Sequence, residues 1–161
     1  MNRIGDSLYC TGSNEEIIVA FSERAVEFVV IGGLAVAWYC SARQADDMDL
    51  LVSPSPENSA RIFQALSRLG LTGFTDSSFS KLGLQVPLKE RHYAELLTPR
   101  KDGPTFSAVA ESAVKGEVFN VPAFIASASS LIQLKEMAVA SAEASKQKHL
   151  NDIECLRPYA V

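Results

Sequence analysis

The sequence has 161 residues and 47% of them are apolar, which is enough for one domain with a buried core. Its net charge of -4 at pH 7 argues against a dedicated, strongly basic nucleic-acid binder, although not against brief contact with a tRNA or with ATP. The longest apolar run, residues 28–40, is too short to cross a bilayer of about 30 Å, and the N-terminus lacks the apolar stretch of a signal peptide. We therefore expect a cytoplasmic protein without a membrane partner.

The first half of the chain alternates between helically spaced apolar residues and short apolar runs. Residues 1–13 are expected to form a loose lead-in, and residues 14–161 the domain. The expected elements are a helix from Ser13 or Asn14 to about Glu27, a buried strand Phe28–Ile31, a helix Leu34–Ala42 after the break at Gly32-Gly33, a strand Asp47–Val52, and a helix from Glu57 or Asn58 to Leu69.

The second half of the chain has weaker periodicity. The expected elements are strands Leu82–Leu88 and Tyr93–Thr98, a charged turn Pro99–Pro104, short strands Phe106–Ala110 and Val118–Val121, and helices from Ser127 or Ser129 to about Ala144 and from Gln147 to Leu156. This order of helices and strands predicts a single α+β (α/β) domain in which helices flank a mixed β-sheet.

The last helix and the two histidines carry further expectations. Helical spacing predicts three inward-facing apolar side chains on that helix: Leu150, Ile153 and Leu156. Lys148 and Asp152 are four residues apart, so they are expected to pair on the surface of the helix. His92 and His149 have no carboxylate or cysteine at ligand spacing, which favours surface positions for both.

The three cysteines, Cys10, Cys40 and Cys155, are an odd number at unrelated spacings. The sequence contains neither a CxxC nor a CxH zinc pattern. This usage favours free thiols in a reducing cytoplasm over a disulfide framework.

Two acidic residues interrupt the second apolar run. Asp47 and Asp49 are two residues apart, and on a strand such residues point to the same face of the sheet. Buried carboxylates are costly unless something pairs with them, and a divalent cation is a suitable partner. The alternative is an ordinary polar strand start at a sheet edge.

Gly32 and Gly33 follow a strand and precede a helix. Backbone N–H groups at a helix N-terminus attract phosphate, and a glycine lets the phosphate approach where a Cβ would block it. The alternative is a tight turn without a ligand.

Gly32-Gly33, Arg43 and Asp47-Met48-Asp49 together resemble the nucleotidyltransferase superfamily of the DNA polymerase β type. Members of that superfamily carry a Gly-Gly or Gly-Ser turn followed by an Asp-x-Asp on the next strand. Residues 31–52 look most like small bacterial nucleotidyltransferase-like proteins, including the AbiEii-type toxins of toxin–antitoxin systems. Ala45 stands where those proteins usually have threonine.

Later stretches extend the resemblance to residues 28–156. Glu95 stands in the place of the third carboxylate that the family supplies from a following strand. Lys135 resembles the lysine of a late helix in the family, and His149 stands where an acid is usual.

The resemblance implies a nucleotidyltransferase fold and a metal-dependent transfer of a nucleoside monophosphate from an NTP to a hydroxyl group. The acceptor would be an RNA, a protein or a small molecule. The implied catalytic and metal-binding residues, for Mg²⁺ or Mn²⁺, are Asp47, Asp49 and Glu95. The implied nucleotide-binding residues are Gly32, Gly33, Arg43 and Lys135.

Each of the weaker assignments has an ordinary structural alternative. Glu95 can be a plain strand carboxylate, Lys135 a helix lysine that extends its amine to solvent, and Arg43 a surface cation. The alternative function is a non-catalytic module of the same fold that binds a nucleotide or a partner. An antitoxin or a second copy of the chain is a further expected partner.

Overall fold

The computed structural model describes residues 13–45, 47–89, 92–141 and 145–160. Predictions for the lead-in up to residue 12, for Cys10 and for Asp46 lie outside these residues. The helices are α1 (Asn14–Glu23), α2 (Gly32–Tyr39), α3 (Pro56–Arg68), α4 (Phe106–Ser112), α5 (Ala128–Ser141) and α6 (Lys146–Leu156), followed by the 3-10 turn η2 (Arg157–Tyr159). The strands are β1 (Phe28–Ile31), β2 (Met48–Val52), β3 (Gln85–Leu88), β4 (Ala94–Leu97), β5 (Val114–Val118) and β6 (Val121–Ile125).

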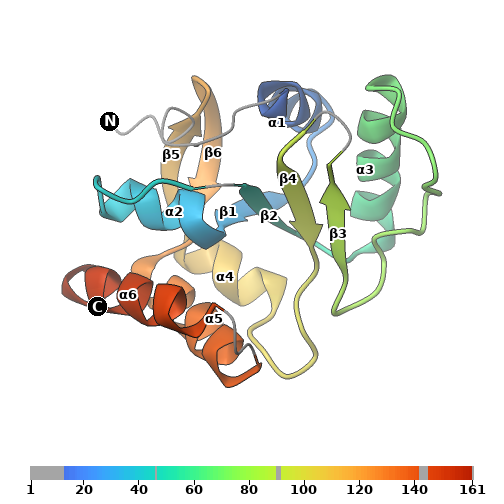
Figure 1. The fold of residues 1–161 in the computed structure, drawn as a ribbon. Coiled ribbons are helices and arrows are strands. Elements are labelled where there is room, and N and C mark those ends of the chain that lie inside the picture. Colours follow the sequence, from blue (N-terminus) through green and yellow to red (C-terminus); the bar gives the residue numbers. More distant parts are fainter. Residues whose placement is uncertain (1–12, 46, 90–91, 142–144, 161) are drawn as a thin grey trace.

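Within the described residues, six strands form one sheet in the order β3-β4-β2-β1-β6-β5. β1 runs antiparallel to β2 and parallel to β6, and β2 runs parallel to β4, so the sheet is mixed, as the sequence predicts. The hairpins β3–β4 and β5–β6 form its two edges. Helices flank the sheet, with α5 and α6 packed together beside α2 and with α1 packed on α3 (Figure 1).

The two central strands are apolar because both of their faces are covered. Val29 and Val30 of β1 and Leu50 of β2 are buried in the core. β1 has the predicted bounds, and β2 begins one residue after the predicted start. The packing of β1 and β2 therefore fixes the positions of the residues at the ends of these two strands.

The start of α3 shows how polar residues set the boundaries of these elements. The Ser55 side chain accepts a hydrogen bond from the Asn58 backbone N–H at 3.1 Å, and Pro56 occupies the first helical turn. Asn58 therefore lies inside the helix and does not cap it. Its buried side chain instead bonds Glu27 and Ser53, which ties the helix to the strands.

Two predicted strands in the second half are wrong. Residues 106–110 belong to helix α4, because the Thr105 hydroxyl accepts a hydrogen bond from the Ala108 N–H at 3.1 Å and caps a helical turn. The predicted strand over residues 118–121 is instead the last residue of β5, a two-residue turn and the first residue of β6. Phe119 (φ 52°) and Asn120 (φ 66°) both adopt the left-handed conformation that a two-residue hairpin turn requires.

The end of α1 and the burial of two side chains also differ from the predictions. α1 ends at Glu23 because Ala25, with φ of 54°, cannot continue a right-handed helix. Leu150 is 38% exposed, whereas Ile153 and Leu156 are buried as predicted. His92 is fully buried, not exposed, and its Nε2 lies 3.4 Å from the Glu16 carboxylate.

The prediction of free cysteines is wrong for the two that the structure describes. Cys40 and Cys155 form a disulfide across 115 residues of sequence. Their pairing depends on the tertiary packing of α6 beside the end of α2, which the spacing of cysteines in the sequence does not reveal. Among the described residues, none of the helices is both long and apolar enough to cross a membrane.

Candidate active site

Three carboxylates meet at the start of β2. Asp49 of β2 pairs in register with Glu95 of β4, because these two strands are parallel neighbours. Asp47 lies two residues before Asp49, and one carboxylate oxygen from each of the three residues lies within 4.8 Å of the others. We call Asp47, Asp49 and Glu95 the acidic triad.

The acidic triad has the features of a cation site. Glu95 Oε1 is buried and finds no hydrogen-bond partner among the described residues, although a buried carboxylate oxygen is normally satisfied. Lys89 forms an ion pair with Asp47. Hard oxygen ligands that converge in this way suit Mg²⁺ or a similar divalent ion, so the residues present fit such a metal.

The electrostatics of Asp49 reflect the crowding of negative charge. The pKa of Asp49 is raised to about 6, mainly by burial and then by the negative charges of Glu95 and Asp47, and the nearby Lys135 and Lys89 offset this only in part. The metal-free triad therefore holds more negative charge than its surroundings stabilise. A bound cation would relieve this repulsion.

We predict that divalent-cation affinity depends on pH through Asp49. Because a metal must displace the Asp49 proton below a pKa of about 6, the affinity for Mn²⁺ should fall by up to about tenfold for each pH unit below 6. Above pH 7 the affinity should be nearly independent of this proton. Titration with Mn²⁺ monitored by calorimetry between pH 5 and 8 measures this, and a flat profile would contradict it.

The glycine bend lies directly against the triad. Gly32 begins α2 with φ of +68°, a conformation that side chains rarely adopt. A Cβ at Gly32 would lie 2.3 Å from Asp49 Oδ2, so only glycine lets the backbone approach the carboxylate this closely. The first N–H groups of α2 consequently begin beside the triad, where a helix leaves its donors without intrahelical acceptors.

A second charged cluster lies behind the glycine bend. Asp152 of α6 is only 3% exposed, and it accepts a hydrogen bond from Arg43 Nε at 2.8 Å and pairs with Lys135 Nζ at 3.0 Å. Burial raises the pKa of Asp152, but hydrogen bonds and charge from Arg43 and Lys135 outweigh this and hold it below the usual range. Asp152 thus makes two buried contacts with residues outside its own helix, and its expected pairing with Lys148 stays a prediction.

This cluster places the two predicted nucleotide-binding cations. The Arg43 guanidinium lies against Gly33, where an added Cβ would meet Nη2 at 2.8 Å, so the alternative of a surface cation does not hold. Lys135 is 8% exposed, which excludes a side chain extended into solvent. Lys135 Nζ also lies 3.5 Å from His149 Nδ1, so His149 belongs to this cluster and not to an isolated surface position.

We predict that Asp152→Asn destabilises the protein. The substitution removes the buried negative charge that stabilises Arg43 and Lys135, and hydrogen bonds to charged groups are worth about 2 kcal/mol. Chemical denaturation should therefore show a free energy of unfolding lower by about 2 kcal/mol. Asp102→Asn, which affects an exposed ion pair with Arg100, is the control and should leave stability unchanged. Equal stability of wild type and Asp152→Asn would contradict the cluster.

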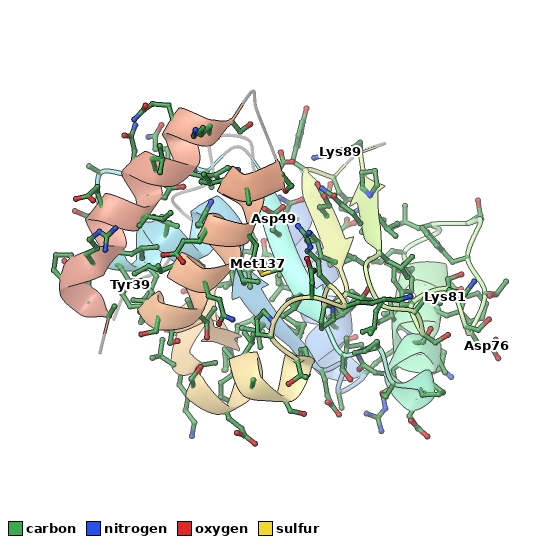
Figure 2. All side chains as sticks on the ribbon, turned by 90° about the horizontal axis from the view of Figure 1, so that it is seen from below. Tyr39, Asp49, Asp76, Lys81, Lys89 and Met137 are labelled. Carbon is green, nitrogen blue, oxygen red and sulfur yellow. A yellow bond between two sulfur atoms is a disulfide. The ribbon has the colours of Figure 1, made fainter. Side chains whose placement is uncertain are left out.

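A pocket of about 190 Å³ opens beside the triad. Gly32, Asp49 and Lys135 are among its lining residues, and most of the others are apolar, including Leu97 of β4 and Met137 of α5. In Figure 2 Asp49, on β2, appears between Lys89 and Met137. The pocket thus joins charged groups to an apolar slot.

A larger cavity, of about 750 Å³, lies at the other end of β1 and is lined by residues that include Phe28, Phe106 and Phe124. None of its lining residues belongs to the acidic triad or to the Asp152 cluster. Because titratable groups with perturbed pKa values converge at the smaller pocket, we assign the candidate active site there.

Sequence comparison finds no matching protein-family model and no similar curated protein. Solved structures do match. An antigenic nucleotidyltransferase-like protein from Paracoccidioides brasiliensis is 14% identical with a TM-score of 0.57, over 94% of this chain and 79% of that one. ANT(2")-Ia in complex with adenylyl-2"-tobramycin is 16% identical with a TM-score of 0.56, over 90% of this chain and 86% of that one.

These likenesses show that the chain has the nucleotidyltransferase fold, as the resemblance in sequence predicts. The narrower likeness to the AbiEii-type toxins stays a prediction from the sequence.

Proposed function

We propose that this protein is a divalent-metal-dependent nucleotidyltransferase that transfers a nucleoside monophosphate from an NTP to a hydroxyl group and releases pyrophosphate. The observation that carries the proposal is the contact of the glycine bend with the acidic triad, in which Gly32 lies against Asp49. It brings backbone donors for phosphate and ligands for a metal to one point, on a fold shared with the nucleotidyltransferases above. Phosphoryl transfer depends mainly on such positioning and charge neutralisation.

The residues would divide the work as follows. Asp47, Asp49 and Glu95 would hold Mg²⁺ or Mn²⁺, which supplies Lewis-acid stabilisation of the phosphate charge when it is bound. The backbone N–H groups at Gly32 and Gly33 would bind the β and γ phosphates. Glu95, whose buried Oε1 has no hydrogen-bond partner among the described residues, would orient the acceptor hydroxyl and take its proton.

Lys135 would offset negative charge on the phosphates, since it lies near enough to Asp49 to lower the pKa of that carboxyl. The Asp152 ion pair holds Lys135 in place. Arg43 would stabilise the glycine bend through its contact with Gly33. The pocket beside Asp49, of about 190 Å³, is smaller than the roughly 300 Å³ of an ordinary ligand pocket, so it would accommodate only part of a nucleotide or acceptor.

The acceptor class is less constrained by these residues. One neighbour of the same fold was solved with an adenylylated small molecule, which supports a hydroxyl-bearing small molecule beside RNA and protein as candidate acceptors. A role as a toxin with a partner antitoxin, self-association and a cytoplasmic location are proposals that rest on the sequence alone.

A labelling experiment tests the proposal. The protein is incubated with each of the four NTPs, labelled at the α-phosphate, with Mg²⁺ and with candidate RNA, protein and small-molecule acceptors. We expect transfer by the wild type, loss in Asp47→Ala and Asp49→Ala, and retention in Asp76→Ala, whose side chain lies in an exposed loop. Transfer that survives both triad substitutions would overturn the proposal, and NTP binding without transfer would favour the non-catalytic alternative.

A further inference from the structure

The disulfide lies close to the candidate active site. Cys40 follows the last residue of α2, the helix that begins at the glycine bend, and Cys155 lies in α6. Cys40 is buried, with 7% of its surface exposed, whereas Cys155 is exposed to solvent. An external thiol can therefore reach the bond from the α6 side.

The disulfide lies close to the ion pair of Asp152 and links the same two segments of the chain. Asp152 precedes Cys155 by three residues, so the two side chains lie about one turn apart on α6. Arg43 follows Cys40 by three residues, and its backbone N–H donates to the Cys40 carbonyl at 2.9 Å. The disulfide and the Arg43–Asp152 ion pair thus join the same two segments side by side.

Two cations, Arg43 and Lys135, connect Asp152 with the candidate active site. The Arg43 guanidinium lies against Gly33 of the bend. Lys135 holds its buried position by pairing with Asp152, and it lines the same pocket as Asp49. If α6 shifts, Lys135 and Arg43 lose the carboxylate that compensates their burial, and unpaired buried cations move toward water.

We propose that the Cys40–Cys155 pair is a redox-sensitive clamp that positions Asp152 and, through it, Lys135 and Arg43 beside the glycine bend. In the oxidised protein the clamp preorganises the phosphate-binding groups. In the reduced protein α6 loosens and the affinity for a triphosphate falls. The effect on the triphosphate rests on the proposed function, whereas the effect on α6 does not.

The switching step is thiol–disulfide exchange with a dithiol reductant. A reductant thiolate attacks the sulfur of the exposed residue Cys155, the bond between the two protein sulfurs breaks, and Cys40 leaves as a thiolate that takes a proton. The second thiol of the reductant then displaces Cys155. The reductant ends as a disulfide and the protein holds two thiols.

The reduced protein should stay folded below its melting temperature. Ile153 and Leu156 of α6 are buried, and α6 packs against α5 without help from the disulfide. The clamp therefore acts on the precise placement of α6. Loss of the bond lowers global stability mainly through the unfolded chain.

Hydrogen exchange tests the clamp without any ligand. We compare oxidised wild type, wild type reduced with dithiothreitol, and Cys155→Ser, with Cys10→Ser as the cysteine control. Faster exchange confined to residues 41–45 and to α6 is expected in the reduced protein and in Cys155→Ser. Reoxidation should restore protection in the wild type and in Cys10→Ser, but not in Cys155→Ser. Equal protection of these segments in both redox states would overturn the clamp; Cys40→Ala replaces Cys155→Ser if the latter fails to fold.

Binding of magnesium tripolyphosphate tests its consequence. We expect the affinity to fall about tenfold on reduction, equivalent to about 1.4 kcal/mol, and to be low in Cys155→Ser in either redox state. Affinity for Mn²⁺ alone should change less than affinity for tripolyphosphate, because none of the three triad residues belongs to α6; a general loss of structure would lower both. Equal triphosphate affinity in both redox states would overturn this consequence, whereas no binding in either state would count against the proposed function and leave hydrogen exchange to judge the clamp.

Discussion

Asp49→Asn is expected to lower nucleotidyl transfer by at least about a thousandfold, because the loss of a metal ligand at the reacting phosphate removes roughly 4 kcal/mol of transition-state stabilisation. Asn is nearly the same size as Asp, so the pocket and the glycine bend keep their shape. Affinity for Mn²⁺ should fall in parallel. Steady-state transfer assays and calorimetric metal titrations measure the two effects.

The same substitution should stabilise the metal-free protein. Burial disfavours the ionised form of Asp49, Glu95 and Asp47 repel it, and its folded-state pKa of about 6 therefore lies above the ordinary value of 3.8. The folded state therefore pays a penalty that is absent below about pH 4 and complete above pH 6, where it reaches about 3 kcal/mol. Asp49→Asn should unfold at higher denaturant concentration than the wild type at pH 7 and show no such advantage at pH 4.

Asp76→Asn is the matched control, since its exposed side chain has no role in the site. It should change neither transfer nor stability. If Asp49→Asn retained transfer, or lost it together with stability at pH 7, the account of Asp49 as a repelled metal ligand would be wrong.

Gly32→Ala is expected to lower transfer by at least a hundredfold, although it adds a single methyl group. The new Cβ would lie 2.3 Å from Asp49 Oδ2, so the carboxylate or the bend must move. Alanine at a φ of +68° would lower the stability of the folded state by about a further 1 kcal/mol. Displacement of Asp49 should weaken Mn²⁺ binding, and displacement of the bend should weaken triphosphate binding.

Gly33→Ala is the adjacent control with a different expected result. Gly33 lacks the left-handed φ of Gly32, and its added Cβ would meet the end of the Arg43 side chain at 2.8 Å, which can shift. We therefore expect a moderate loss of triphosphate affinity and unchanged affinity for Mn²⁺. Equal effects of the two substitutions on Mn²⁺ binding would show that the bend does not position Asp49.

The parts of the fold that the sequence predicts well depend on local patterns. The strand Phe28–Ile31 is continuous, apolar and followed at once by glycines, so no other element competes for it. The convergence of Asp47 and Asp49 follows from the two-residue period of a strand. Glu95 is predicted from the family resemblance alone. Its position opposite Asp49 depends on the parallel register of β2 and β4, which the local sequence pattern does not reveal.

The wrong predictions come from short apolar runs that fit more than one element. Residues 106–110 have no period long enough to separate strand from helix, and the Thr105 cap decides for the helix. The turn at Phe119 and Asn120 was hidden because phenylalanine rarely adopts a positive φ. In both cases a polar residue marks the correct structure: Thr105 caps the helix, and Asn120 lies in the turn.

The charged cluster and the disulfide were beyond prediction for a different reason. Asp152 pairs with Arg43, which is 109 residues away in the sequence. Cys40 and Cys155 meet only once α6 has packed beside α2. Such contacts depend on the assembled fold, and no local spacing in one sequence encodes them.

The most direct test of the central claim is anomalous diffraction from crystals grown with Mn²⁺ and a non-hydrolysable NTP analogue. The account predicts manganese coordinated by oxygens of Asp47, Asp49 and Glu95, with the triphosphate against Gly32 and Gly33. Saturating Mn²⁺ without an anomalous peak at these carboxylates, or a nucleotide bound elsewhere on the protein, would contradict it.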